Sequence, residues 1–377
     1  MITEPIRILQ VFGRLDRGGA EGVIMNLYRK FDRTKIQFDF VVHTDKKCAY
    51  DDEIVKLGGR IYRVPQFKGI NIFSYFKAWN KFFKKHKEYK IIHSHVSSTA
   101  IIYLLLAKSK GLTTIIHSHS TSSGKGFQAL VKDILQVPLR FICDYYIACS
   151  HDAGNWLFGK RVTKSEKFYL LKNAIDMNEF NFNEDSRSKI RNELNISENK
   201  KVIIHVGNFC YPKNHEFLID IFSSLLKEND SYILLLVGDG ELRQPIEEKV
   251  TNILIQDKVK FLGVREDVSR LLSASDLFLF PSHFEGLPLS LIEAQASSLP
   301  CLISNAIPNE VIVTDLIQTL SLSDSAKIWS DKVKDIVSKE CDRKPRMSNE
   351  LNEYDITKTS KWLFEFYMKL SNEREGK

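Results

Sequence analysis

Short apolar segments alternate with longer helical segments along most of this chain. One unit begins at Ile91-Ile92-His93-Ser94-His95, continues through a helical segment from Thr99 to Lys110, and ends at Ile115-Ile116-His117-Ser118-His119. A strand, a helix and a strand in this order form a right-handed crossover that makes the two strands parallel. The pattern predicts an α/β protein with parallel sheets. Both His-Ser-His segments should then lie at the carboxyl ends of strands, where such sheets bind ligands.

Two alternations separated by a polar stretch indicate two domains. The 377 residues exceed a single ordinary core, for which roughly 150 to 200 residues are typical. The first alternation closes near residues 145–150, and residues 178–201 are polar and charged. A second alternation starts at residues 202–207. We therefore predict one domain at residues 1–175 and another at residues 176–354.

The composition limits the class of protein. The fractions of 43% hydrophobic and 27% charged residues are those of a globular chain. No apolar run approaches the roughly 20 residues of a transmembrane helix, and residues 1–12 lack the basic head of a secretory signal. Six cysteines without a C-x-x-C pair argue against zinc fingers and a disulfide framework, which favours a cytoplasmic location. The net charge of +7 favours anionic partners but is no nucleic-acid signature, so we expect no nucleic-acid partner.

The segment from Leu277 to Ala294 predicts a binding loop between a strand and a helix. The apolar run at residues 277–281 predicts a buried strand, and Pro288 suits the first turn of the following helix. The amides of Gly286 and Leu287 at this helix start would lack intrahelical acceptors and could bind an anion such as a diphosphate. Gly286 would let the backbone approach that anion closely.

Two glutamates flank this helix start. Glu285 precedes it, and Glu293 follows after seven intervening residues, about two turns into the helix. Carboxylates repel phosphates, so their expected partners are hydroxyl groups, and Glu293 would hold a ribose diol. The alternative is an ordinary strand-to-helix turn with solvated glutamates.

A second phosphate-binding element is predicted in the same domain. Gly207 ends a strand and leads through Asn208 to Lys213, just ahead of a helix expected at residues 216–227. A cation beside a helix amino terminus suits a diphosphate. Lys213 is therefore the expected phosphate ligand.

The N-terminal domain offers a glycine loop and four histidines. A strand at residues 6–12 leads to Gly18-Gly19-Ala20-Glu21 and a helix expected from Gly22, so the loop could bind a phosphate or sugar; a turn requiring positive φ is the alternative. The two His-x-His pairs suggest a metal site. The lack of an evident carboxylate or cysteine ligand argues against it.

These motifs together resemble those of retaining glycosyltransferases of family 4, which have the GT-B fold. The strongest parts are the glutamate pair, with Gly and Pro after the first glutamate, and Lys213 ahead of it. The resemblance implies two Rossmann-like domains with a cleft between them, the first carrying the acceptor and the second the nucleotide sugar. It also implies that a helix at about residues 355–377, with Trp362, Phe366 and Leu370 at helical spacing, returns to the first domain.

The resemblance also implies roles for individual residues. It implies a nucleotide-diphosphate sugar as donor, a glycan or lipid-linked acceptor in cell-surface polysaccharide assembly, and no cofactor or metal requirement. The implied catalytic residues are His119, Glu285 and Lys213. The implied donor-binding residues are Gly18, Gly19, His117, Asn208, Gly238, Val264, Gly286, Leu287 and Glu293. A glycosidase would also use two carboxylates, but it would not need phosphate-binding helix starts.

Asn208 departs from the family pattern. The family has an arginine here, and an asparagine forfeits a charge-assisted hydrogen bond worth roughly 1 to 3 kcal/mol. A GT-B-shaped binding partner without catalytic activity is therefore the alternative function.

A lysine-rich segment suggests contact with a membrane. Residues 68–90 hold seven lysines and one acid, Glu88. The helix expected from Phe73 to Lys87 places Phe73, Phe76, Trp79 and Phe83 on one stripe, which we expect to cover the sheet. The basic face could rest on anionic lipid at the inner face of the cell membrane; a solvated outer face is the alternative.

Overall fold

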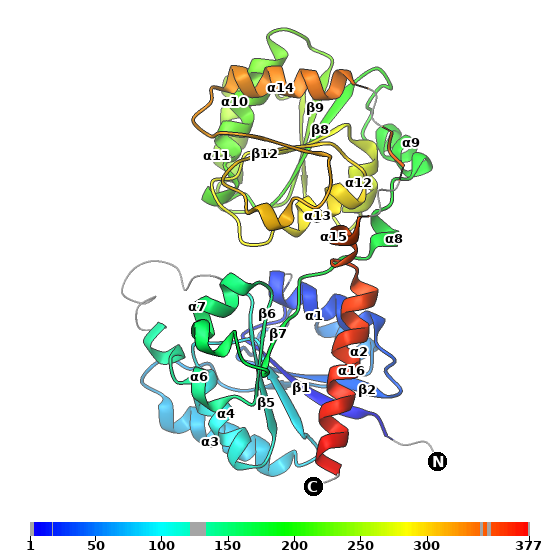
Figure 1. Ribbon diagram of the computed structural model, residues 1–377. Coiled ribbons are helices and arrows are strands. Elements are labelled where there is room, and N and C mark those ends of the chain that lie inside the picture. The colour runs from blue at the N-terminus through cyan, green and yellow to red at the C-terminus, as the bar shows by residue number, and fades with distance from the viewer. Residues whose placement is uncertain (1–3, 17, 121–132, 340–341, 345–347, 376–377) are drawn as a thin grey trace. The chain divides into compact units, whose positions relative to one another are not determined.

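The computed structural model describes residues 4–16, 18–120, 133–339, 342–344 and 348–375 (Figure 1). The first three residues of the expected first domain and the last two of the expected terminal helix lie outside this range. The chain forms two compact units, one of Met1–Ala174 with Ile356–Lys377 and the other of Ile175–Asp355. In the described residues no helix has the length and hydropathy needed to cross a bilayer.

The first unit is built on a seven-stranded parallel sheet with the order β3-β2-β1-β4-β5-β6-β7. Its strands are β1 Ile6–Phe12, β2 Ile36–Val42, β3 Ile61–Arg63, β4 Ile91–Ser94, β5 Thr113–Ser118, β6 Tyr145–Ala148 and β7 Phe168–Leu170. The predicted strand-helix-strand unit is β4, α4 (Ala100–Ser109) and β5, with His93 aligned to Ile115. The two His-Ser-His segments therefore end neighbouring strands.

Helices cover this sheet, and the chain's last helix is one of them (Figure 1). The others described are α1 Gly19–Lys30, α2 Asp51–Lys56, α3 Ile72–Lys85, α4, α6 Leu139–Ile142 and α7 His151–Val162. The last helix, α16 (Ile356–Glu375), packs beside α1. The Tyr367 ring lies edge-on to Phe38 of β2 at 5.8 Å, and Gln10 of β1 donates to the Tyr367 hydroxyl at 3.1 Å. The expected return of the terminal helix to the first unit is confirmed.

The expectation for the aromatic stripe of α3 is wrong in part. Trp79 and Phe83 are buried as expected, together with Tyr75 and Phe82. Phe73 is 88% exposed and Phe76 is 46% exposed. The packing face of α3 is rotated toward Tyr75 and Phe82, because the Trp79 ring stacks on Tyr103 of α4 at 4.6 Å. Two phenylalanines are left on the solvent side of this helix.

The second unit is built on a six-stranded parallel sheet with the order β10-β9-β8-β11-β12-β13. Its strands are β8 Lys201–Val206, β9 Tyr232–Val237, β10 Val259–Gly263, β11 Leu277–Phe280, β12 Cys301–Ser304 and β13 Ile317–Leu320. Its described helices are α8 Met177–Phe180, α9 Glu184–Glu193, η1 Tyr211–Lys213, α10 His215–Leu226, α11 Arg243–Asn252, α12 Val268–Ala274, α13 Leu289–Ala296, η2 Asn309–Val311, α14 Ala326–Ser338 and α15 Asn349–Asn352. Both sheets are Rossmann-like, as predicted.

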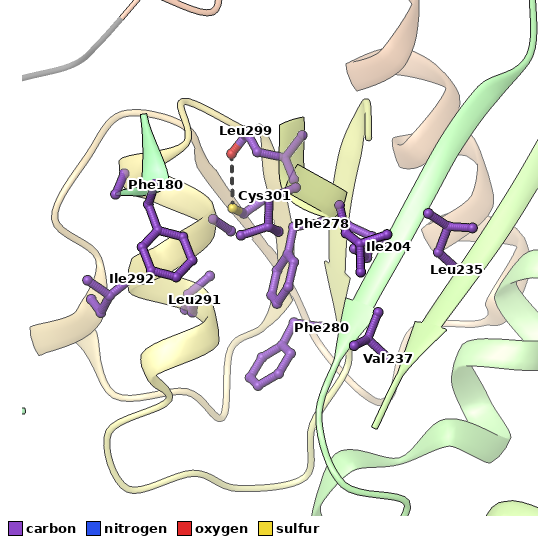
Figure 2. Packing of buried hydrophobic residues seen from close by; sticks show 14 of the residues in the cluster. Phe180, Ile204, Leu235, Val237, Phe278, Phe280, Leu291, Ile292, Leu299 and Cys301 are labelled. Carbon is purple, nitrogen blue, oxygen red and sulfur yellow. Dashed lines mark hydrogen bonds between the residues drawn. The ribbon is translucent and has the colours of Figure 1, made fainter. Parts of the chain in front are cut away.

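The core of the second unit anchors the predicted binding loop at both of its ends. Phe278 and Phe280 of β11 and Leu291 and Ile292 of α13 are fully buried in one cluster. Figure 2 shows Phe278, Phe280 and Leu291 between the strands and α13, and Ile292 on the other side of that helix near Phe180. Because strand and helix are both fixed by packing, residues 281–288 between them are held in place at the carboxyl edge of the sheet.

Candidate functional site

Three loops of the second unit meet at the carboxyl ends of β8, β9 and β10. The amide of Gly207 donates to Val237, and the amide of Gly238 donates to Gly263, at 2.9 and 2.8 Å. Gly238 has a φ of +139°, and a Cβ there would lie 2.1 Å from the carbonyl oxygen of Gly207. Only glycine at position 238 lets the two backbone segments come this close. Gly238 therefore fixes the position of the loop that begins at Asn208.

The loop after β8 is tied to the loop after β11. The amide of His283 donates to Pro212 at 2.8 Å, and the Asn214 side chain donates to Pro281 at 3.0 Å. The rings of Tyr211 and His283 stack at 4.7 Å. These contacts bring the two sequence-predicted phosphate-binding elements, which are about 70 residues apart in the chain, to one place.

Lys213 and Glu285 form an ion pair across these loops. The distance from Lys213 Nζ to Glu285 Oε1 is 2.7 Å, and the two side chains are only 16% and 12% exposed. The ammonium also lies 4.7 Å from the centre of the Phe280 ring. Its stem crosses Gly207, where an added Cβ would come within 3.0 Å of Lys213 Cε. Lys213 is therefore held in a single direction by a carboxylate, a ring and a glycine.

The backbone beside this pair offers two donors. Helix α13 begins at Leu289, with Pro288 as its N-cap rather than in its first turn. Within the described structure the amides of Gly286 and Leu287 have no hydrogen-bond acceptor. A Cβ at Gly286 would meet no atom within 4 Å, so the space in front of it is open. Two amides and an ammonium at one edge suit an anion.

Glu293 lies in the second turn of α13 and is half-buried. Burial raises the pKa of its carboxyl to about 7, and the nearby carboxylate of Glu179 on α8 adds to the increase. In the described residues no donor bonds its carboxylate. A half-buried carboxyl without a donor suits a ligand that brings its own hydroxyl groups.

Asn208 and Val264 lie on the rim of this edge. Asn208 is exposed, and Val264, just after β10, is 63% exposed. The neighbouring cation, Arg265, is bound by Asp267 at 2.8 Å and by Glu193 at 3.1 Å. Arg265 is thus already engaged and does not replace the arginine that the family has at position 208.

Two histidines of this edge were missed from the sequence. His205 and His215 are buried, and their rings lie 4.7 Å apart. Burial lowers the pKa of both, that of His215 to about 4, and the charge of Lys213 lowers both further. Neutral rings therefore lie close to Lys213. The sequence could have indicated both, because one histidine stands in the apolar strand at residues 202–206 and the other directly follows Lys213-Asn214.

The helix after the glycine loop of the first unit starts earlier than predicted. Helix α1 starts at Gly19, three residues before the expected Gly22, and Gly18 is its N-cap with a φ of −91°. Neither glycine has a positive φ, so the alternative of a turn that requires one is wrong. Both residues are exposed, with the amino end of a 12-residue helix beside them.

The four histidines gather at the ends of β4 and β5. The rings of His117 and His119 stack at 3.9 Å, and those of His95 and His119 lie 5.1 Å apart. His95 Nδ1 and His119 Nε2 are hydrogen-bonded at 2.8 Å. Burial lowers the pKa of His119 to about 3, so its ring is neutral at physiological pH. This hydrogen bond with His95 directly orients the His119 ring.

The first unit has one cavity beside the histidines and another at the amino ends of its strands. A pocket of about 340 Å³ opens beside the histidines, lined by His95, Ser97, His119, Gln136 and Trp156. A larger one of about 810 Å³ lies among residues at the amino ends of β5 to β7, including Thr113 and Tyr145. Open parallel sheets bind ligands at the carboxyl ends of their strands, and the amides of Gly286 and Leu287 lie at that end of the second sheet.

Two family models match successive parts of the chain. Residues 17–179 match the family model described as Glycosyltransferase Family 4, and residues 186–355 match that of Glycosyl transferases group 1. The chain is 36% identical over 334 residues to the putative glycosyltransferase EpsF of Bacillus subtilis, covering 87% of this chain and 86% of that one. It is 27% identical to the UDP-Gal:alpha-D-GlcNAc-diphosphoundecaprenol alpha-1,3-galactosyltransferase of Escherichia coli, covering 76% and 79%.

A solved structure shares the fold. Anabaena HepE in complex with UDP-glucose superimposes with a TM-score of 0.74 at 18% identity, covering 96% of this chain and 99% of that one. The relationship to EpsF covers 87% of this chain and therefore extends into both units. This chain belongs to glycosyltransferase family 4, has the GT-B fold and is an enzyme of the glycosyltransferase class.

Proposed function

We propose that the second unit binds a nucleotide-diphosphate sugar, with the diphosphate on Lys213 and on the amides of Gly286 and Leu287. The observation that carries this is the meeting of one held ammonium and two amides without acceptors at a single edge. Glu293 would accept hydrogen bonds from the ribose, and the backbone near Val264 would meet the base. The HepE structures contain UDP and UDP-glucose, which supports a donor of this class.

The reaction we propose is glycosyl transfer with retention of configuration. The bond between the anomeric carbon and the diphosphate oxygen breaks, and an acceptor hydroxyl bonds to that carbon on the same face. The acceptor's proton passes to the leaving diphosphate. Lys213 and the two amides stabilise the negative charge that develops there, which requires no metal ion. His119 would contact the donor sugar, and Glu285 would keep Lys213 directed at the diphosphate.

The test of this function is a panel of nucleotide sugars. Purified protein should be stabilised against heating by one donor class, and it should transfer or slowly hydrolyse that donor. Proton NMR of the first product should show the anomeric configuration of the donor. Inverted configuration would contradict the retaining mechanism. No donor stabilisation together with no turnover would contradict the proposed donor and favour the non-catalytic alternative, which membership of the family already disfavours.

Asn208 gives a prediction about affinity. Asn208→Arg should tighten binding of the nucleoside diphosphate about tenfold, equivalent to 1.4 kcal/mol, because it restores a charge-assisted contact at the exposed rim. The gain should shrink with added salt, because an exposed charge is screened. Titration calorimetry at two ionic strengths checks this. Unchanged or weaker binding at both would mean that position 208 does not face the diphosphate.

We propose further that the acceptor is a glycan or is lipid-linked, and that α3 brings the enzyme to an anionic membrane surface. The relative from Escherichia coli is named for a diphosphoundecaprenol-linked acceptor. Ile70, Ile72, Phe73 and Phe76 are exposed together at the start of α3. The seven lysines of residues 68–90 are all exposed, and within the described chain none of them pairs with a carboxylate. Exposed aromatic side chains among unpaired lysines suit the interface of an anionic bilayer.

The double variant Phe73→Ser/Phe76→Ser should lower partitioning onto vesicles that contain anionic phospholipid by about tenfold, because it removes apolar area that would enter the interface. Sedimentation with vesicles measures this. The matched control is Leu254→Ser, at a residue of the second unit that is 78% exposed, and it should leave partitioning onto the vesicles unchanged. Equal binding of the double variant and the wild type, or equal binding to neutral vesicles, would rule out this surface.

A further inference from the structure

Four imidazole rings fill a small volume at the carboxyl ends of β4 and β5. The rings of His93 and His95 lie 4.4 Å apart, and that of His117 lies 5.3 and 5.4 Å from them. His93 and His117 are at most 1% exposed, and His95 is half-buried. One ring nitrogen from each of these three residues lies within 4.8 Å of the others.

Hydrogen bonding leaves several of these nitrogens unused. In the described structure His93 Nε2 and both nitrogens of His117 are buried without a partner. A buried donor or acceptor without a partner costs about 1 to 3 kcal/mol. Packing alone does not account for rings that carry such nitrogens. The neutral imidazole, with one nitrogen lone pair free, is the form of histidine that binds metal ions.

Hydrogen bonds with Tyr367 and Gln10 orient the rings of His93 and His95. His93 Nδ1 is hydrogen-bonded to the Tyr367 hydroxyl at 2.6 Å; in the tautomer whose Nδ1–H donates to that oxygen, Nε2 carries a lone pair and has no partner in the described residues. His95 Nε2 is hydrogen-bonded to Gln10 Oε1 at 2.8 Å. That oxygen can only accept, so His95 Nε2 carries the proton and Nδ1 carries the lone pair. A partner on the ring nitrogen that does not bind the ion is typical of metal-binding histidines.

We propose that His93 Nε2, His95 Nδ1 and one nitrogen of His117 form a site for a divalent transition-metal ion of the zinc class. His95 Nδ1 now accepts from His119, so the ion would replace that hydrogen bond. Three neutral imidazoles match the borderline-soft ions, whereas magnesium and calcium require oxygen ligands. The site would link β4 to β5 and, through Tyr367 and Gln10, to α16 and β1. It has no part in the proposed transfer chemistry, which requires no metal.

The test is zinc binding by the whole chain, freed of any affinity tag and dialysed against a chelator. Titration calorimetry should show one zinc ion bound per chain, and zinc should raise the melting temperature. Cobalt(II) in its place should give the intense visible absorption of a four-coordinate ion. X-ray absorption at the zinc edge should show imidazole ligands and no sulfur. Absence of binding, or a cobalt spectrum like that of the ion in water, would overturn the proposal.

Variants assign the ligands. His93→Phe and His117→Phe keep a buried ring and should abolish zinc binding. Gln10→Leu should weaken it about tenfold or more, because an orienting partner is lost. His119→Asn removes the ring that occupies His95 Nδ1, so zinc binding should persist or tighten. His86→Asn, on a histidine outside the cluster, should leave zinc binding unchanged. Zinc binding that survives His117→Phe, or that is lost in His119→Asn, would overturn the assignment, and neither result depends on donor binding or turnover.

Discussion

Replacement of Lys213 by methionine is expected to lower kcat about 100- to 1000-fold, which is the typical loss when a group that stabilises transition-state charge is removed. Methionine keeps much of the apolar stem that crosses Gly207 and lies near Phe280, but it places no charge at the leaving diphosphate. The fold-decrease in kcat should exceed the fold-decrease in donor affinity, because negative charge on the diphosphate grows as the glycosyl bond breaks. Steady-state kinetics with the donor found by the panel checks this result.

Two controls separate this role from structural damage. Lys249→Met removes another partly exposed lysine of the same unit, one that pairs with Asp220 at 2.6 Å, and should leave kcat unchanged. Glu285→Gln removes the carboxylate that holds Lys213 and should lower kcat less than Lys213→Met does. A Lys213→Met enzyme with normal kcat and raised KM would show that the ammonium binds ground state and transition state equally, which contradicts its catalytic role.

Donor affinity should rise with pH through the pKa of Glu293, and Glu293→Gln should weaken donor binding about 100-fold at pH 8. The raised pKa of about 7 means that the carboxyl of the free protein is protonated below pH 7 and ionised above it. Only the ionised form accepts two strong hydrogen bonds from a ribose diol, each worth roughly 1.5 to 3 kcal/mol. Binding should therefore release a proton near pH 7. Calorimetric titration in buffers of different ionisation enthalpy measures that proton directly.

The same pKa predicts an opposite effect on stability. A carboxyl whose folded-state pKa is raised from about 4.3 to about 7 makes the folded protein less stable as the pH rises through that interval. Glu293→Gln should therefore melt at a higher temperature than the wild type at pH 8 and bind donor more weakly. Glu179→Gln, which removes the neighbouring charge, should lower the pKa of Glu293 and move the affinity profile to lower pH. A pH-independent donor affinity in the wild type would remove Glu293 from the ribose.

The parallel strands were predictable from residues close together in the chain. Alternation of apolar and helical segments places β4, α4 and β5, and Pro281 and Pro288 bound the loop between β11 and α13, because proline restricts the backbone locally. The start of α1 was misplaced by three residues, because Gly19 was taken as a loop residue and lies in a helix. Helical periodicity also misjudged Phe73 and Phe76, because it does not fix which side of α3 meets α4.

The sequence by itself determined the α/β class, the membership of family 4 and the residue types of the donor loops, since each depends on local pattern and short motifs. Only the tertiary structure decided how those residues pair. It pairs Glu285 with Lys213 and hydrogen-bonds His95 to His119. It also raises the pKa of Glu293 near Glu179. Finally, it leaves His93 and His117 with buried nitrogens that have no partner in the described chain. These features come from side chains far apart in the chain. Their distances and burial depend on how strands and helices pack, which local sequence does not specify.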